Sequence, residues 1–449
     1  MTGTTRELAE WVSATCFDEL PDDVLARTRT HLLDTLAAVV VGHSRPWTRR
    51  VLAYAEEQSP PGNSMVLPAG PRLRPEWAAL VNGTAAHGFE IDDYALPGLS
   101  HPGCAVVPAA LAVAQDLHAV GRRLLTALAI GYEITVRFGR ATTPSLTSDR
   151  GFHVTSVLGV LGATAAAASL SGLDAATTQS ALGLAASMAG GTTEFTRTGG
   201  DVKRLHGGFA AAAGVRAAAL AGAGLTGPRA AIEGERGFLA GFVEHAAPEE
   251  LTRGLGRQWM LHDLGIKRWC VCAGLQAPLA VLGELIERHR FGPADIDEIR
   301  VGLDGPTLAH VGRLGPRPAD LTEAQLSLHH ALATKLVLGG NDPVHYAAFE
   351  RGREPEAVAE VGQRVTGYLD AGADAVFPRR VLATVTVHLS DGRELTATGE
   401  APGSPRKPMS AAQVRAKFDR LTRPVLGERA DALLDLVPVD NDLKEVPGQ

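Results

Sequence analysis

Cysteine and aromatic residues are scarce in this sequence of 449 residues, and basic residues do not outnumber acidic ones. It has four cysteines, 5% aromatic residues and a formal net charge of −7. So few cysteines cannot build a disulfide framework, which indicates a reducing compartment, and we expect a cytoplasmic protein. The negative charge argues against nucleic acid or an anionic membrane as partner, because both attract basic surfaces. It leaves room for a small anionic substrate held by a few local cations.

Several common signals are also missing. Polar residues and glycines interrupt every apolar run before it reaches membrane-spanning length, and the first residues lack the pattern of a signal peptide. The sequence contains no GxGxxG, P-loop, GxSxG or HExxH motif, so nucleotide-binding and hydrolase functions lack support. Cys270 and Cys272 are too close together for a CxxC redox or zinc half-site.

The pattern of apolar residues predicts a mainly α protein. Helical periodicity runs from residue 5 to about 260, with many alanines and glycines that let helices pack closely. The character then changes: "IDEIRVGL" alternates like a strand, and "RVLATVTVHLSDGRELTATGEA" predicts a hairpin around Ser-Asp-Gly. We therefore expect a large all-helical domain from residues 1–264 plus 404–449, with a smaller α+β domain inserted at 265–403.

Four polar islands interrupt the helical sequence. The first is "HGFEIDDYALPGLSHPG" (87–103), and the others surround His153, the segment Lys203–Arg204–His206, and the pair Lys267–Arg268. Each has an ordinary structural explanation, such as a helix cap, a packed histidine or a solvated loop. His87, Glu90 and Asp92 match no usual zinc spacing, so we expect no metal.

Together the islands indicate chemistry on a polycarboxylate. Their lysines, arginine and histidines could neutralise several carboxylates, and two of the islands begin helices, whose N-termini favour anions. Acidic residues beside them could supply or orient a general base. This set suits removal of a proton α to a carboxylate, with the cations stabilising the enolate that develops.

These islands, in this order, resemble the MmgE/PrpD family over essentially the whole chain. The segments that carry the resemblance are "DTLAAVVVG", "NGTAAHGFEIDDY", "SHPG", "GFHVTSVLGVLGATAAAASLSGL", "KRLHGGFAAAAGVRAAALA", "GIKRWCVC" and "AQLSLHHALA". The resemblance implies a cofactor-free, homodimeric enzyme whose active site lies between a large helical domain and a smaller α+β lid domain. It places the following residues on the family's active-site positions: Asp93, His101, His153, Lys203 and Lys267, with His206 at the family spacing after Lys203.

Four positions depart from the family pattern. Glu90 stands where the family usually has Asp, and Tyr94 replaces a smaller Thr or Ser. Gln276 stands in place of a downstream histidine, and His330 occupies the position of a tyrosine in the family's decarboxylase. These departures argue that the substrate differs from those of the best-known members.

The leading hypothesis is a lyase that dehydrates or decarboxylates a small di- or tricarboxylic acid. In it Lys203 and Lys267 hold carboxylates, His101 or His153 moves the proton, Asp93 holds the site in register, and Tyr94 donates to a leaving hydroxyl. The residues expected to bind substrate are Glu90, Arg204, His206, Arg268 and His330. Two alternatives stay open: an epimerase or isomerase that returns the proton to the other face, and a non-catalytic carboxylate-binding or structural dimer.

Overall fold

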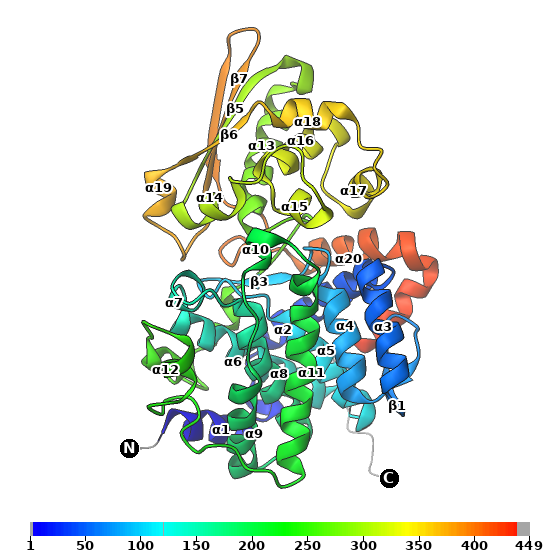
Figure 1. The fold of residues 1–449 in the computed structure, drawn as a ribbon, viewed down its shortest axis with the longest axis vertical. Helices are drawn as coiled ribbons and strands as arrows, with labels where there is room; N and C mark the ends of the chain where they lie inside the picture. Colours follow the sequence, from blue (N-terminus) through cyan, green and yellow to red (C-terminus); the bar gives the residue numbers. More distant parts are fainter. Residues whose placement is uncertain (1–2, 120, 438–449) are drawn as a thin grey trace. The chain divides into compact units, whose positions relative to one another are not determined.

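The chain packs as two compact units. A computed structural model describes residues 3–119 and 121–437 (Figure 1). The first unit, here called the helical unit, comprises Met1–Leu264 and Ser410–Gln449; the second, the mixed unit, comprises Gly265–Met409. The sequence predicts an insertion at 265–403.

The helical unit is built from helices with a few short strands. The helices are α1 (Thr4–Ala14), α2 (Asp22–His43), α3 (Pro46–Gln58), α4 (Pro75–His87), α5 (Gly103–Asp116), α6 (Arg122–Thr142), α7 (Ser145–Ser148), α8 (Val154–Leu170), α9 (Ala175–Met188), α10 (Phe195–Thr198), α11 (Val202–Gly222), α12 (Phe238–Phe242) and α20 (Ala411–Leu426). The strands are β1 (Pro61–Met65), β2 (Arg72–Leu73) and β3 (Asp93–Ala95), and β4 (Leu264–Ile266) begins at the last residue before the insertion. Short 3-10 helices lie at Phe17–Glu19, Pro248–Leu251, Met260–Asp263 and Gly427–Leu436.

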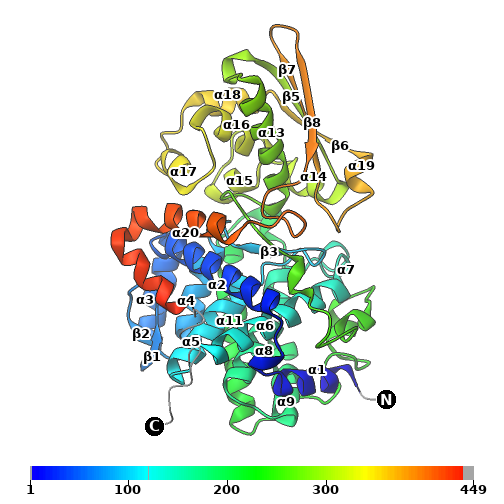
Figure 2. The same cartoon turned by 180° about the vertical axis from the view of Figure 1, so that it is seen from behind.

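Glycines bring α4 and α11 into backbone contact, and this contact positions the candidate site. The two helices run side by side, and α11 also packs against α8 (Figures 1 and 2). A Cβ added at Gly83 would lie 2.8 Å from the Cα of Gly208, and one added at Gly208 would lie 2.3 Å from the carbonyl oxygen of Leu80. Only glycine fits such an approach. The close packing holds the end of α4 against the start of α11.

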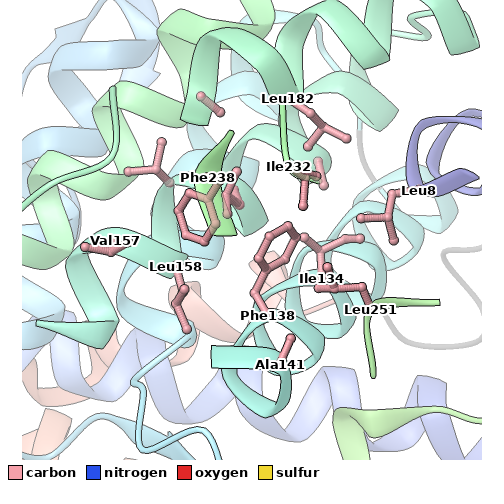
Figure 3. Packing of buried hydrophobic residues seen from close by; sticks show 14 of the residues in the cluster. Leu8, Ile134, Phe138, Ala141, Val157, Leu158, Leu182, Ile232, Phe238 and Leu251 are labelled. Carbon is pink, nitrogen blue, oxygen red and sulfur yellow. The ribbon is translucent and has the colours of Figure 1, made fainter. Parts of the chain in front are cut away.

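A hydrophobic core fills the helical unit between α1, α6, α8, α9 and α12. Figure 3 shows Phe138 and Phe238 at its centre, with ring centroids 5.5 Å apart and planes at 89°, the edge-to-face geometry that aromatic pairs favour. Leu8, Leu158 and Leu182 are fully buried around them. Truncating a buried Phe in such a core costs about 3–5 kcal/mol.

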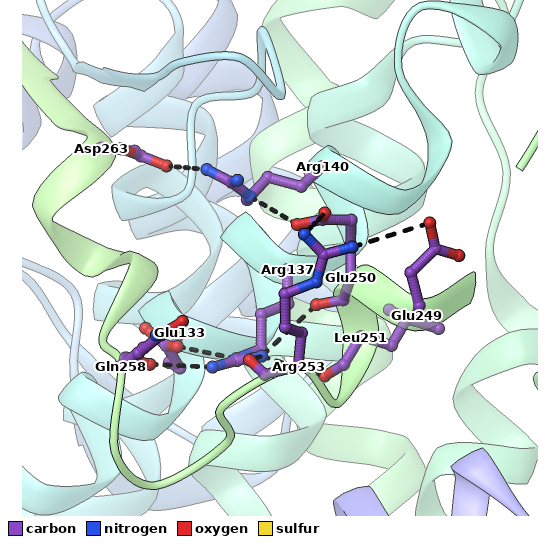
Figure 4. A network of polar contacts seen from close by, with 9 residues as sticks. All are labelled: Glu133, Arg137, Arg140, Glu249, Glu250, Leu251, Arg253, Gln258 and Asp263. Carbon is purple, nitrogen blue, oxygen red and sulfur yellow. Dashed lines mark hydrogen bonds and ion pairs between the residues drawn. The ribbon is translucent and has the colours of Figure 1, made fainter. Parts of the chain in front are cut away.

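A buried ion-pair network ties the segment after α12 to α6 (Figure 4). The Arg137 guanidinium donates to the Glu133 carboxylate (2.7 Å) and to the carbonyls of Arg253 (2.9 Å) and Gln258 (2.8 Å). The second carboxylate oxygen of Glu133 accepts from the N–H of Leu261 at 3.0 Å. Burial raises the pKa of Glu133, and the Arg137 charge opposes that shift. The charges of Arg137 and Glu133 are paired with each other, so the network stabilises the fold.

The mixed unit contains a four-stranded sheet and the helices that connect it. Its helices are α13 (Gln276–His289), α14 (Gly305–Val311), α15 (Leu321–Leu326), α16 (Leu328–Leu338), α17 (Pro343–Glu350), α18 (Glu356–Gly362) and α19 (Ala371–Asp374), with 3-10 helices at Ala273–Leu275 and Pro293–Asp295. Its strands are β5 (Ile296–Leu303), β6 (Val365–Leu369), β7 (Ala383–Leu389) and β8 (Glu394–Gly399), in the order β6-β5-β7-β8. β5 pairs in parallel with β6 and antiparallel with β7, while β7 and β8 form the predicted hairpin.

The fold class predicted from sequence is confirmed: the protein is mainly α, with a smaller α+β part. The predicted strand "IDEIRVGL" is β5, and side chains along β7 alternate between buried and half-buried, as a sheet with one covered face requires. Three short strands inside the region expected to be helical, β1 to β3, were not predicted. Among the described residues, no helix is both long and apolar enough to cross a membrane.

Candidate active site

The acidic loop leaves the end of α4 with an unusual backbone turn. His87 is the last residue of α4, and Glu90 adopts a left-handed conformation with φ of 57°. A non-glycine residue in this region is uncommon and is often found at functional sites. The Glu90 carboxylate forms an ion pair with the ammonium of Lys203, which lies in the first turn of α11, and both side chains are buried. The loop therefore brings a carboxylate onto the lysine predicted to hold substrate.

Asp92 is the carboxylate that faces the histidines. Its Oδ2 lies 2.6 Å from Nδ1 of His87 and 3.7 Å from Nδ1 of His101. Asp92 and His87 are both completely buried. Because an ionised carboxylate only accepts hydrogen bonds, Nδ1 of His87 carries the proton and Nε2 carries the lone pair.

Asp93 contacts the start of α5 with its carboxylate and His101 with its backbone carbonyl. Its carboxylate accepts from the N–H of Gly103 (2.9 Å) at the start of α5 and lies 3.3 Å from Nδ1 of His31. Its backbone carbonyl accepts from Nδ1 of His101 at 2.6 Å. A negative charge is favoured at a helix N-terminus. Asp93 thus fixes the ring of His101 through its carbonyl, while its carboxylate is engaged by the start of α5.

His101 is held by two hydrogen bonds, of which the one at its ring sets the tautomer. A carbonyl only accepts, so the contact with Asp93 places the proton on Nδ1 and leaves Nε2 of a neutral ring as the basic nitrogen. The backbone N–H of His101 donates to Oγ1 of Thr155 at 3.1 Å, which joins the loop to the first turn of α8. The ring is 14% exposed, so it can meet a ligand.

His153 and His206 complete a row of histidines. His153 stands just before α8, as predicted, and its Nδ1 lies 2.8 Å from Nδ1 of His206 on α11. The ring of His153 stacks on that of His87, with centroids 5.6 Å apart, and the ring of His101 lies 5.4 Å from His87 on the same measure. Phe195 contacts both His153 and His206 edge-on. Four histidines from different parts of the helical unit therefore lie in ring contact.

Burial and nearby charge keep three of these rings neutral at pH 7. Burial, followed by the charge of Lys203, lowers the pKa of His87 well below its usual value. Burial, then the neighbouring His87 and His206, does the same to the pKa of His153. Burial and Lys203 lower the pKa of His206 to about 4. Neutral imidazoles can accept protons once an anionic ligand offsets the charge of Lys203.

Arg204 and Tyr94, two further predicted residues, lie in the same unit. The Arg204 guanidinium lies over the ring of Trp47 (3.9 Å to the centroid) and donates to the carbonyl of Gly88 at 2.6 Å. These contacts fasten the acidic loop to α11, and the substrate-binding role of Arg204 stays a prediction. Tyr94 is buried in β3, directly after the acidic pair. Its role as a proton donor also stays a prediction.

The remaining predicted residues belong to the mixed unit. Lys267 and Arg268 follow β4, and His330 lies in the first turn of α16. Nδ1 of His330 faces the carbonyl of Ala324 at 3.2 Å, and Nε2 lies 3.0 Å from the Glu354 carboxylate. Both ring nitrogens therefore have acceptors inside the unit, an arrangement typical of a structural histidine. The predicted roles of Lys267, Arg268 and His330 in binding substrate stay predictions.

Gln276 fixes the shape of the Lys267 segment. Its Oε1 accepts from the N–H groups of Arg268 (2.9 Å) and Trp269 (3.2 Å), and its Nε2 donates to the carbonyls of Trp269 (3.0 Å) and Val271 (3.3 Å). A histidine offers only two ring nitrogens and could not make these four contacts. Gln276 therefore holds the backbone of this loop through four hydrogen bonds from a neutral side chain.

A thiol lies on the same loop. Burial raises the pKa of the Cys272 thiol, but its hydrogen bond to His310 and the charges of His310 and Lys267 outweigh burial. The net effect is to lower this pKa to about 7. Cys270 is buried, and neither cysteine forms a disulfide bond. His310 and Lys267 are therefore the polar groups that act on this thiol.

One group of described residues has the composition of a metal site. Ligand atoms of His87, Asp92 and Cys104 lie within 4.8 Å of one another, all three side chains being buried. The 2.6 Å contact between His87 and Asp92 is a hydrogen bond, and Sγ of Cys104 lies 3.0 Å from the carbonyl of His101 as a donor. The positive charge of Lys203, which acts on His87, also disfavours a cation. Each of the three groups therefore takes part in a hydrogen bond.

The sequence did not predict the contacts that residues from distant segments make with the acidic loop. Nζ of Lys417, on α20, lies 2.5 Å from Oδ1 of Asp34 and donates to the carbonyl of Ile91 at 3.0 Å. Asp34 and Lys417 are both buried, so α20 helps fix the residue beside Asp92. No local motif marks Lys417. Asp34 lies inside the segment "DTLAAVVVG" that carries the resemblance, which was the available signal.

The fold and site define a mainly helical protein with a buried acid–base cluster of histidines, carboxylates and a lysine. The sequence profile of the MmgE/PrpD N-terminal domain matches residues 6–251, and that of the MmgE/PrpD C-terminal domain matches residues 269–439. The chain belongs to the MmgE/PrpD family.

Similar proteins span nearly the whole chain. It is 28% identical over 454 residues to a cis-aconitate decarboxylase of Aspergillus terreus, covering 97% of this chain and 92% of that protein. It is 29% identical over 457 residues to the cis-aconitate decarboxylase of Homo sapiens, covering 98% of this chain and 92% of the human protein. A cis-aconitate decarboxylase-like protein of Aspergillus oryzae is 29% identical over 445 residues, covering 94% and 91% of the two chains.

Proposed function

We propose that this protein is a lyase that removes CO2 or water from a small tri- or dicarboxylic acid. The observation that carries the proposal is His101: its Nδ1 proton is held by the carbonyl of Asp93, so Nε2 is the nitrogen left to exchange a proton. Lys203 and three further histidines lie around it. The relatives named cis-aconitate decarboxylases support a polycarboxylate as substrate.

The chemistry needs one proton transfer to or from carbon. Loss of CO2 leaves the electron pair of the broken C–C bond on the substrate, where a neighbouring carboxylate and double bond delocalise it, and carbon then takes up one proton. Loss of water instead begins with removal of a proton from carbon and ends with a leaving hydroxide that is protonated. A histidine held at Nδ1 can serve either direction, as base when neutral and as acid when protonated.

Lys203 is proposed to stabilise the negative charge that develops on the substrate. Glu90 pairs with the Lys203 ammonium, so a substrate carboxylate has to share or replace that partner. A lysine ammonium offers three donors from one point charge and can contact two carboxylates together. Glu90 thereby sets how much anionic charge the site accepts.

An epimerase is the second candidate, and His153 is the observation that favours it. The rings of His101 and His153 both contact His87, so two acid–base groups lie within one cluster. An epimerase needs one such group to remove a proton and another to return it. Solvent deuterium entering the substrate without CO2 loss or alkene formation would select this candidate over a lyase.

The proposal includes a homodimer without a cofactor. On α11, Phe209 is 46% exposed and Val202 is 40% exposed, although both are apolar. Apolar side chains exposed on a long helix are typical of a subunit contact. Light scattering of the purified protein tests the assembly, and metal analysis after dialysis against EDTA tests the cofactor.

Product analysis on a panel of polycarboxylates tests the function. We expect turnover of at least one hydroxy- or unsaturated tri- or dicarboxylate, read as released CO2, a change in alkene absorbance, or carbon-bound deuterium in D2O. The panel should include cis-aconitate, citrate and smaller dicarboxylates. Thermal stabilisation by these acids with no turnover of any would contradict a lyase and support the non-catalytic alternative.

A further inference from the structure

Asp92 and His87 form a pair whose contacts point beyond packing. One carboxylate oxygen of Asp92 lies 2.6 Å from Nδ1 of His87 and 3.7 Å from Nδ1 of His101. Both members of the pair have no exposed surface. Nε2 of His87 is buried and finds no hydrogen-bond partner among the residues that the structure describes. Burying an imidazole nitrogen without a hydrogen bond costs free energy, so packing alone does not explain this arrangement.

The geometry points to Asp92 and His87 as positioning residues for His101, an inference that rests on the proposed function in which His101 moves the proton. Asp92 provides the negative charge that stabilises His101 when its ring becomes an imidazolium. His87 holds that carboxylate in place by donating its Nδ1–H. A carboxylate behind a histidine in this way stabilises the charged ring and fixes its tautomer.

The charges around His101 explain why such a counter-ion is needed. His87 faces it from α4, His153 from the start of α8, Cys104 from α5 and Lys203 acts on the same cluster from α11. The Lys203 charge opposes protonation of the rings, and so does burial. Asp92 is the carboxylate that opposes both effects at the same Nδ1 edge, since Glu90 is paired with Lys203 and Asp93 meets His101 through its carbonyl.

Asp92 and Asp93 act on His101 in different ways. Asp93 supplies a carbonyl, which fixes where the His101 proton lies but carries no full charge. Asp92 supplies the charge, and the hydrogen bond from His87 prevents its carboxylate from rotating away. Removing either contact should therefore change a different property: the ring orientation in the first case and the protonation equilibrium of His101 in the second.

Histidine titration in the ligand-free protein tests this inference. The protein is labelled at the histidine ring carbons, and the His101 signal is identified by its absence in His101→Gln. In Asp92→Asn, whose amide oxygen can still accept from His87, we expect the His101 titration midpoint to fall by about one pH unit or more. In Asp174→Asn, a change at the exposed N-cap of α9 where Asn caps equally well, we expect no shift.

Two variants of His87 separate positioning from packing. Asn places an amide donor close to where Nδ1 lies, whereas Phe fills the space without a donor. We expect His87→Asn to keep the wild-type His101 midpoint and His87→Phe to lower it as Asp92→Asn does. Far-UV circular dichroism and the melting temperature confirm that each variant is folded.

The outcomes are separate from those of the proposed function, because no substrate is present. An unchanged His101 midpoint in folded Asp92→Asn would overturn the inference even if the enzyme turns over a polycarboxylate. A stoichiometric metal that resists EDTA and is lost in Asp92→Asn would also overturn it, since the pair would then be ligands. If a substrate is found, the pH profile of kcat should move with the His101 midpoint in the same variants.

Discussion

Arg137 and His87 are both completely buried in the helical unit, yet their polar atoms are used to different extents. Arg137 donates to Glu133 and to several carbonyls (Figure 4). The second oxygen of Glu133 accepts from the N–H of Leu261. His87 has one hydrogen bond, to Asp92, and its Nε2 meets no partner in the described residues. The Arg137 network is therefore closed, meaning that its polar atoms are paired with one another, whereas His87 keeps one ring nitrogen without such a partner.

The mixed unit offers the same contrast within one residue type. Both ring nitrogens of His330 have acceptors, from Ala324 and Glu354, so this histidine has the closed pattern. His101 has one nitrogen engaged by a carbonyl and a partly exposed ring. A nearby carboxylate is therefore common to the two histidines. Solvent access distinguishes them, because the ring of His101 is partly exposed and that of His330 is buried.

The largest effect on activity is expected from His101→Gln. Gln keeps a polar side chain but cannot exchange a proton, and loss of a general acid or base costs about 10²–10⁴-fold in rate. Melting should change little, since the ring is partly exposed. Steady-state kinetics on the substrate found in the panel give the loss, with exposed His245→Gln as the control. A His101→Gln enzyme with wild-type kcat would place the proton transfer elsewhere.

The closed network should respond in the opposite way. Arg137→Met leaves Glu133 buried without its partner, and breaking a buried ion pair costs about 3–5 kcal/mol of stability. Urea unfolding measures that cost, while kcat per folded molecule should stay near wild type. The double variant Arg137→Met with Glu133→Gln should be less destabilised than the sum of the two single changes. A loss of kcat without a loss of stability would break the comparison.

The Glu90 pair lies between these extremes, because it is buried but competes with substrate. Glu90→Gln leaves the Lys203 ammonium with a neutral neighbour, so a substrate carboxylate becomes the better partner. We expect KM to fall several-fold, where a tenfold change corresponds to about 1.4 kcal/mol. Lys203→Met should raise KM instead. Equal KM values in all three proteins would show that Lys203 does not meet the substrate.

A smaller effect is expected in the pH dependence of stability. Burial lowers the pKa of His206 to about 4 and those of His87 and His153 well below their usual value, which unfolding restores to about 6.5. Between these values the unfolded chain binds more protons than the folded one, so stability rises with pH and is lost as the pH falls from about 6.5 towards 4.

Calorimetry from pH 7.5 to 4.5 measures this dependence. His206→Asn should reduce the proton uptake on unfolding by up to about one proton, and exposed His245→Asn should leave it unchanged. A His206→Asn protein with the wild-type pH dependence would contradict the lowered pKa.

The sequence carried enough information for the fold class and for much of the cluster. The strand Ile296–Leu303 could be predicted because its side chains alternate, and His101, His153 and Lys203 because they stand in polar islands. β1 (Pro61–Met65) could not, since "PGNSM" has neither alternation nor β-branched residues. The local sequence therefore predicts strands whose apolar and polar residues alternate, and polar residues that interrupt an apolar helical stretch.

The division of labour between Asp92 and Asp93 was beyond the sequence. Adjacent residues in extended chain point to opposite sides, and a sequence does not state which side faces the histidines. Lys417 was missed for a different reason. It reaches the carbonyl of Ile91 across 326 positions of the chain, and only the packing of α20 brings the two together.

The central claim is that His101, in the histidine cluster of the helical unit, exchanges a proton with a carbon atom of a polycarboxylate. The most direct measurement runs wild type and His101→Gln side by side on cis-aconitate in D2O and counts CO2 and carbon-bound deuterium by mass spectrometry. The account predicts one carbon-bound deuterium per CO2 in the wild-type product and a rate lower by about 100-fold or more in the variant. Equal rates and equal deuterium incorporation in the two proteins would contradict it.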